Sequence, residues 1–154
     1  MKYGFGNYRL TFTPEVVKIF LSYRQVKKEQ PESGGILLGR IYGDGRIVID
    51  QITTPSNEDR SGRHFFDRNV ERAQRIVKEA WKQSCGEVRY LGEWHTHPEA
   101  NPIPSLTDRK LIIGMMEDSI LDHKFLFMVI IGLRDNYVGV SCRGEKHITQ
   151  LLPF

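Results

Sequence analysis

The segment Glu93-Trp-His-Thr-His-Pro98, followed by Ser105-Leu-Thr-Asp108, holds the most informative pattern in the chain. Alternate side chains of a strand share a face, so a strand over residues 90–97 places Glu93, His95 and His97 on one face. The proline-rich residues 98–104 indicate a stiff loop, and Ser105 is the expected start of a helix that runs to about residue 117. The pattern therefore predicts a strand and a helix joined so that polar side chains meet at their ends.

Two imidazoles and one carboxylate of this segment form a candidate Zn²⁺ site. Zinc favours imidazole nitrogen together with carboxylate oxygen, and a catalytic site leaves the fourth tetrahedral position to water. His95 and His97 share a strand face, and Asp108 completes the set if the loop returns the first helical turn to the end of the strand. Glu93 lies on the same face and is a candidate partner for orienting a ligand imidazole.

Each half of the pattern also has a purely structural interpretation. Ser105-x-x-Asp108 matches a helix capping box, in which the serine oxygen accepts a backbone N–H and the acid reaches back to the cap. A His-x-His pair on a strand also occurs as an ordinary polar face. Cys142 as a nucleophile is a weaker alternative, because the residue falls in an expected strand and no base is paired with it in the sequence.

Hydrophobic periodicity extends the prediction toward the N-terminus. A strand is expected over residues 8–12, and Thr13-Pro14 supplies the cap and first turn of a helix that closes after the basic run near Lys27 and Lys28, before Pro31. Residues 36–41 and 47–52 flank Gly43-Asp44-Gly45 and predict a hairpin. Residues 53–66, which contain His64, are rich in polar and turn-forming types and predict an exposed, mobile loop.

The remaining elements alternate between helix and strand. Residues 67–84 have a 3.6-residue apolar period and predict a helix that Gly86 ends. Residues 125–133, 137–142 and 147–152 predict strands, with His123 and His147 at strand edges. Helices around a largely hydrophobic sheet indicate an α/β domain.

Composition narrows the class of protein. A chain of 154 residues, 40% apolar and 27% charged, fits one soluble domain over residues 1–154. The net charge of +3 is scattered in both signs, which argues against a nucleic-acid partner, and no apolar stretch predicts a signal or a membrane span. Two distant cysteines without a CxxC pair argue against disulfides and thiolate zinc sites, so a cytoplasmic location is expected.

Together the motifs resemble the signature of the JAB/JAMM metalloproteases, Glu…His-Ser/Thr-His-Pro-x6-Ser-x-x-Asp. His95-Thr-His-Pro98, Ser105 and Asp108 match it at full spacing, and Glu32 precedes Ser33-Gly-Gly-Ile-Leu-Leu-Gly39, which is similar to the strand that follows the glutamate in the family. The resemblance implies a single MPN domain of the cytidine-deaminase-like type, with a mixed central sheet flanked by about three helices.

The resemblance also implies the roles of the site residues. His95, His97 and Asp108 would bind Zn²⁺, which lowers the pKa of a water molecule. Glu32 would act as general base and then as general acid, and Ser105 would help to stabilise the oxyanion. A competing assignment makes Glu93 the base, but only Glu32 has the sequence context of the family.

The substrate implied by the resemblance is a protein joined to its target through its C-terminus. The stretch Gly92-Glu-Trp-His-Thr-His-Pro-Glu99 is similar to small JAB/JAMM isopeptidases of bacterial CBASS anti-phage operons, encoded beside a cGAS-like nucleotidyltransferase (CD-NTase) and an E1–E2 fusion. The expected partner is the C-terminal tail of a conjugated CD-NTase, held as an extended chain that adds to a sheet edge. The alternatives are a peptidase for another ubiquitin-like or sulfur-carrier protein, and a non-catalytic MPN scaffold.

Overall fold

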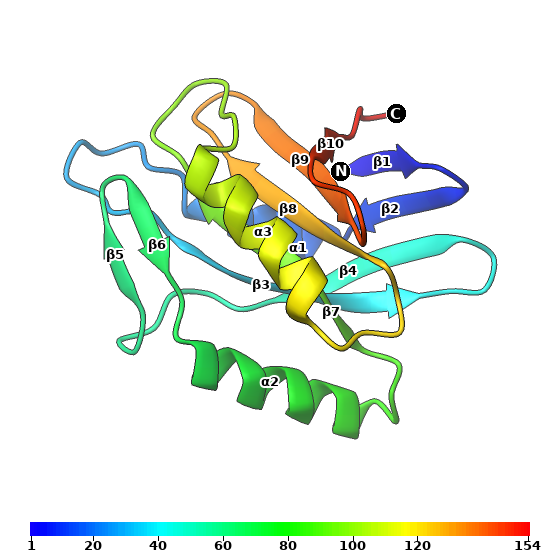
Figure 1. Ribbon diagram of the computed structural model, residues 1–154. Helices are drawn as coiled ribbons and strands as arrows, with labels where there is room; N and C mark the ends of the chain where they lie inside the picture. The colour runs from blue at the N-terminus through cyan, green and yellow to red at the C-terminus, as the bar shows by residue number, and fades with distance from the viewer.

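Three helices and ten strands form the fold of the computed structural model, which describes residues 1–154 (Figure 1). Along the chain they are β1 (Lys2–Phe5), β2 (Tyr8–Phe12), α1 (Pro14–Ser22), β3 (Gly34–Ile41), β4 (Arg46–Ile52), β5 (Arg60–Gly62), β6 (Phe65–Asp67), α2 (Val70–Gln83), β7 (Arg89–Thr96), α3 (Leu106–Asp118), β8 (Phe125–Ile131), β9 (Asn136–Cys142) and β10 (Ile148–Gln150).

Eight strands make one mixed sheet in the order β1-β2-β4-β3-β7-β8-β9-β10, and β5 pairs with β6 as a separate hairpin. The pairs β2–β4 and β7–β8 are parallel, and the other neighbours are antiparallel. The sheet curls until its ends meet, since Tyr3 of β1 bridges to Pro153 and the N–H of Phe154 donates to the carbonyl of Lys2 at 3.2 Å. Figure 1 accordingly shows the two termini beside each other.

The curled sheet separates two hydrophobic cores. Alternate residues of β8 enter opposite cores, which explains why this strand is a continuous apolar run buried on both faces. On the α1 side the core includes Val16, Phe20, Leu37, Leu91, Trp94 and Phe127. On the α2 and α3 side it includes Ile36, Ala73, Tyr90, Ile112, Met116 and Met128.

Strand β7 contains an irregularity that requires glycine. The register of β3 against β7 shifts between Leu37 and Leu38, opposite Leu91, and the next residue, Gly92, has a φ of 138°. A Cβ at Gly92 would lie 1.9 Å from the carbonyl oxygen of Phe127 on β8. Only glycine therefore allows β7 to approach β8 at this point, directly before the segment that carries the two histidines.

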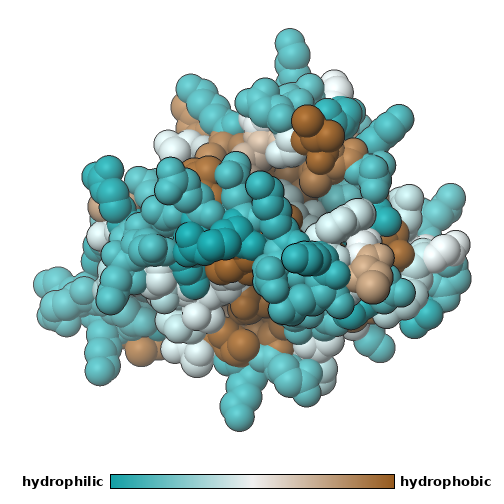
Figure 2. Space-filling view, turned by 90° about the horizontal axis from the view of Figure 1, so that it is seen from below, coloured by the Kyte–Doolittle hydropathy of each residue, from teal (hydrophilic) through white to brown (hydrophobic).

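Helix α2 shows a partly apolar surface to solvent. Val70 and Trp81 are exposed on it, and Ile120, in the segment after α3, is fully exposed. A groove between α2 and this segment is lined by Val77, Trp81, Val88, Tyr90, Ile120 and Leu121. Figure 2 views the molecule from below, the side of α2, and shows hydrophobic residues between hydrophilic ones. None of the three helices is long and apolar enough to cross a membrane.

Most predicted elements are confirmed, but three details differ. Helix α1 ends at Ser22, not near Lys28. Its last turn has no basic residue to stabilise the helix end, and the side chains of Gln25 and Gln30 instead hold the following residues as a loop. The predicted loop over residues 53–66 contains β5 and most of β6. The antiparallel pairing of these two strands therefore orders part of it, and His64 is exposed in the turn between them. Strand β1 was not expected, since it is short and contains Gly4.

His123 is near the start of β8, as expected, but it is more buried than its position in the sequence indicates. It lies before β8 with 8% of its surface exposed and with no hydrogen bond to either ring nitrogen. Burial lowers the pKa of its imidazole to about 4, and the nearby Arg89 acts in the same direction. His123 is therefore a neutral, buried residue outside the metal-ligand segment.

Gly92→Ala tests the close approach of β7 and β8. The added methyl group would meet a backbone oxygen in a strained conformation, so we expect the free energy of unfolding to fall by about 3 kcal/mol. Gly114→Ala in α3 is the control, because a Cβ there meets nothing within 4 Å, and it should stabilise the protein by about 0.5–1 kcal/mol. Urea denaturation measures both, and equal effects would contradict the explanation.

Candidate metal centre and active site

The end of β7 brings two imidazoles together. The Nε2 atoms of His95 and His97 are 3.1 Å apart, on the face of the strand opposite Trp94 and Thr96. Backbone pairing fixes both residues, since His95 is opposite Gly34 of β3 and the N–H of His97 donates to the carbonyl of Ile131 at 3.0 Å. The predicted alternation along the strand is therefore the one observed.

Asp108 reaches the two imidazoles from the first turn of α3. Its Oδ1 lies 3.3 Å from Nε2 of His95, and its Oδ2 lies 3.3 Å from Nε2 of His97. Both halves of the predicted capping box are also formed: Ser105 N–H donates to Asp108 Oδ2 at 2.8 Å, and Asp108 N–H donates to Ser105 Oγ at 3.1 Å. The cap fixes the rotamer that aims the carboxylate at the histidines.

The three side chains fit a tetrahedral metal ion. Bonds of about 2.0–2.1 Å to a tetrahedral ion place neighbouring ligand atoms about 3.3 Å apart. The two Nε2 atoms are 3.1 Å apart, and each lies 3.3 Å from a carboxylate oxygen of Asp108, His95 from Oδ1 and His97 from Oδ2. One ligand atom from each of His95, His97 and Asp108 falls within 4.8 Å of the others. Two nitrogen donors and one oxygen donor are the set that suits zinc with one open position.

Mutual charge interactions shift the pKa values of the site residues. Burial acts to raise the pKa of Asp108, but hydrogen bonds from His95 and His97 outweigh it, and the pKa lies well below the ordinary value. Burial acts to lower the pKa of His97, but Asp108 and Glu32 outweigh it, and the pKa is raised. The carboxylate is therefore ionised at neutral pH, which is the form that binds a cation.

Glu32 enters the site from the chain just before β3. Its Oε1 lies 4.0 Å from Nε2 of His97, and only 5% of its surface is exposed. Burial raises the pKa of the Glu32 carboxyl to about 7, with Asp108 and Glu99 adding to the effect and His97 opposing it. A carboxyl group with this pKa can both accept and release a proton near neutral pH. The structure thus joins Glu32 to residues more than sixty positions away.

Glu93 faces a different set of partners. Its carboxylate accepts two hydrogen bonds from Nε of Arg68, at 2.8 and 2.9 Å, and one from the hydroxyl of Tyr90 at 2.6 Å. No hydrogen bond joins it to His95. Burial raises the pKa of Glu93, and Arg68 opposes this shift. The predicted role of Glu93 in orienting a ligand imidazole has no direct contact to support it, and its observed contacts join β7 to the chain before α2.

Sequence reasoning missed the residues that hold these groups in place. Arg68, Gln25 and Thr96 make buried polar contacts around the site, but nothing in their sequence spacing distinguishes them from surface residues. Among the other histidines, His147 is exposed and makes a contact with Glu145, so it lies outside the site as expected.

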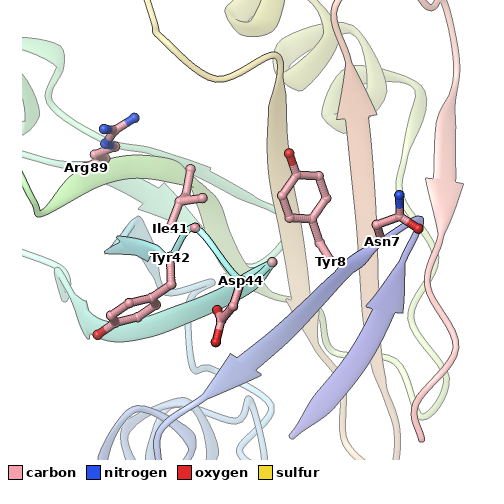
Figure 3. Close-up of a pocket in the computed structure, with 8 residues that line it drawn as sticks. Asn7, Tyr8, Ile41, Tyr42, Asp44 and Arg89 are labelled. Atoms are coloured by element: carbon pink, nitrogen blue, oxygen red, sulfur yellow. The ribbon is translucent and has the colours of Figure 1, made fainter.

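The hollow of Figure 3 lies away from this site. It is lined by Tyr8, Ile41, Tyr42, Asp44 and Arg89, among others, which come from the turns β1–β2 and β3–β4 and the beginning of β7. Because β3 and β7 are antiparallel, Ile41 and Arg89 are at the opposite end of the two strands from Gly34 and His95. None of the predicted site residues lines this hollow.

A curled mixed sheet, with a His-Thr-His strand end facing a Ser-x-x-Asp helix cap and a buried glutamate beside them, defines a JAMM-type peptidase. The sequence matches the prokaryotic homologs of the JAB domain over residues 16–143. The chain belongs to this family.

Individual relatives agree with this assignment. The chain is 40% identical over 124 residues to a CD-NTase/cGAS isopeptidase of Vibrio cholerae, covering 80% of this chain and 76% of that protein. It is 36% identical over 132 residues to a protein of the same name from Escherichia coli, covering 85% and 81%. A solution structure of a protein from Desulfitobacterium hafniense has the same fold, with a TM-score of 0.60 at 22% identity over 92% of this chain and 88% of that one.

Removal of single ligands tests the candidate metal centre. We expect the wild-type protein to retain about one zinc ion per chain after dialysis, and His95→Ala to retain almost none, because two protein ligands hold zinc poorly. His64→Ala, at an exposed position outside the site, is the control and should keep its metal. Elemental analysis of the dialysed proteins gives the result, and full zinc content in His95→Ala would refute the ligand assignment.

Removal of the cation from the buried ion pair of Arg68 and Glu93 should destabilise the protein. Arg68→Met leaves a buried carboxylate without its cation, so the free energy of unfolding at pH 7 should fall by about 3 kcal/mol. The raised pKa of Glu93 would rise further in this variant. The deficit should therefore shrink as the pH falls through that pKa, since a protonated carboxyl needs no cation.

A solvent-exposed pair provides the comparison for this measurement. Arg75 lies 3.7 Å from Glu58, and both side chains are more than half exposed. Arg75→Met should change the stability by less than about 0.5 kcal/mol. Thermal or urea unfolding between pH 4 and pH 8 distinguishes the two variants, and a deficit of Arg68→Met that does not change with pH would contradict the charge-burial explanation.

Proposed function

We propose that this protein is a zinc-dependent isopeptidase that removes a protein conjugated through its C-terminus, and that its substrate is a conjugated CD-NTase in CBASS anti-phage defence. The observation that carries the catalytic part is the meeting of Glu32 with His95, His97 and Asp108. A non-catalytic scaffold has no need of this arrangement. The substrate is supported by the names of the relatives from Vibrio cholerae and Escherichia coli.

The residues of the chain provide the proton transfers that isopeptide hydrolysis needs. Zinc held by His95, His97 and Asp108 would polarise the scissile carbonyl and lower the pKa of a water molecule from 15.7 to about 7. Glu32 accepts a proton from the attacking water and delivers it to the departing lysine amine, a double task open to a buried carboxyl group beside the metal ligands.

Ser105 is proposed to stabilise the oxyanion of the tetrahedral intermediate. Its oxygen accepts the N–H of Asp108 in the helix cap, and its hydroxyl proton remains able to donate to a substrate oxygen. Capping and catalysis therefore use different parts of one hydroxyl group. An oxyanion donor of this kind contributes about 10² to 10³ in rate.

A conjugate of the cognate CD-NTase, or a reporter fused after its C-terminus, tests the proposed activity. The wild-type protein should cleave directly after the C-terminal residue, lose activity on chelation and regain it with zinc. Cleavage of a ubiquitin-like or sulfur-carrier fusion in its place would reject the CD-NTase substrate but keep the isopeptidase. Conjugates of this kind form inside the cell, so the proposal includes a cytoplasmic location.

Carboxamide variants test the assignment of the base. Glu32→Gln should lower kcat by about 10² to 10⁴ without loss of zinc. Glu29→Gln, the same change at an exposed position of the same segment, should leave kcat unaltered. The folded fraction of Glu93→Gln should have a kcat close to that of the wild-type protein. Near-normal turnover by Glu32→Gln together with an inactive, folded Glu93→Gln would overturn the assignment.

A further inference from the structure

The carboxamide of Gln25 is buried between three separate parts of the chain. Only 2% of the residue is exposed. Its Nε2 donates to the carbonyl of Gln30 at 3.2 Å and to the carbonyl of Arg63 at 3.0 Å, and its Oε1 accepts from the hydroxyl of Thr96 at 2.9 Å. Gln25 thus joins the segment before β3, the turn of the β5–β6 hairpin and the end of β7.

Thr96 continues this chain of hydrogen bonds to the residue after Glu32. Its hydroxyl accepts the N–H of Ser33 at 2.9 Å while donating to Gln25, and its own N–H donates to the carbonyl of Ser33 at 2.9 Å. Thr96 has no exposed surface and lies between the two histidines of the metal site. The same residue therefore holds both the strand of the candidate ligands and the backbone next to Glu32.

The backbone of Glu32 depends on such contacts because no helix or strand contains it. Residues 23–33, between α1 and β3, have no regular secondary structure. The N–H of Glu32 donates to the carbonyl of Gly62 on the hairpin at 2.8 Å, and Ser33 is held by Thr96. The hairpin and β7 are thus the two anchors on either side of Glu32, and Gln25 is the side chain that contacts both.

We propose that Gln25 is a positioning residue, which sets the distance between the Glu32 carboxylate and the His95–His97 pair by joining the hairpin to Thr96. This inference rests on the proposed role of Glu32 as the proton-transfer group. A displacement of about 1 Å in a reacting group can lower the rate about 10²-fold. Polar networks that are buried and fully paired hold such geometry well, and they lose it when one member is removed.

Gln25→Met tests the proposal, since methionine has a similar length but cannot make the three hydrogen bonds. We expect kcat to fall about 10²-fold, with KM within about twofold and zinc content unchanged. Gln30→Met is the matched control: the side chain of Gln30 bonds only to Tyr23 and Lys27 within the same segment, so kcat should stay within about threefold. Equal losses of kcat in Gln25→Met and Gln30→Met would overturn the proposal, because they would show that kcat depends only on the folding of residues 23–33.

A double-mutant cycle separates positioning from general damage. If Gln25 acts through Glu32, the variant Gln25→Met/Glu32→Gln should have the kcat of Glu32→Gln alone, to within about threefold. A further 10²-fold loss in the double variant would overturn the proposal. Near-normal kcat in Gln25→Met, with Glu32→Gln inactive, would overturn it while leaving the proposed function intact. Full activity of Glu32→Gln would instead refute the proposed role of Glu32 as the proton-transfer group, on which this inference rests.

Amide hydrogen exchange of the metal-free protein gives a readout independent of catalysis. In Gln25→Met the amides of Glu32 and Ser33 should exchange at least about tenfold faster, while those of β8 stay unchanged. Should this variant not fold, Gln25→Asn, which is too short to reach all three partners, is measured in the same way. Unchanged exchange at Glu32 and Ser33 in a folded variant would contradict the proposal.

The hydroxyl of Thr96 supplies the conservative comparison. Thr96→Ser retains the group that joins Gln25 to Ser33 and should keep kcat within about threefold. Thr96→Val has nearly the same shape without the hydroxyl, and it should lower kcat about 10²-fold. Equal kcat values in the two variants would exclude the hydrogen-bond path from Gln25 to Glu32.

Discussion

The antiparallel pairing of β3 with β7 is the constraint on which the rest of the structure depends. It places Gly34 opposite His95, so that the chain just before β3 lies against the histidine end of β7. A Cβ at Gly34 would lie 2.6 Å from the carbonyl oxygen of Trp94 and from the ring of Phe66. Both strands lie at the centre of the sheet, and a slip of one residue would turn the histidines away from Asp108.

Around the pairing of β3 with β7, the burial of carboxyl groups opposes their ionisation. Burial disfavours the ionised forms of Glu32, Glu93 and Asp108, which stand just before β3, on β7 and in the first turn of α3. The three carboxyl groups differ in their favourable partners. Glu93 contacts the guanidinium of Arg68 and the hydroxyl of Tyr90, and Asp108 contacts two imidazoles and the helix cap. Glu32 has His97 as its favourable partner, at 4.0 Å, and Asp108 and Glu99 oppose its ionisation. The carboxyl group with the fewest partners is the one whose pKa lies near neutrality, which is the property that proton transfer requires.

Local patterns predicted the parts of the fold that local physics decides. The capping box at Ser105, the apolar run of β8 and the alternation along β7 each follow from residues close in sequence. The convergence of Glu32 on the histidines was expected only from resemblance to a family, because no local rule pairs β3 with β7. The contacts of Gln25 and Arg68 were not predicted, since a polar residue gives no sign in sequence that its partners lie 25 to 71 positions away.

The double use of Asp108 has a consequence for related chains. One of its oxygens accepts the cap hydrogen bond from Ser105 and also faces His97. A descendant that had lost catalysis would therefore still be selected to retain Ser105 and Asp108, because loss of the cap costs about 1 kcal/mol of stability. Retention of this pair in a related chain can therefore reflect only the need to begin a helix, whereas Glu32 caps no helix. The presence of a glutamate before β3 is therefore the better indication that a related chain is still catalytic.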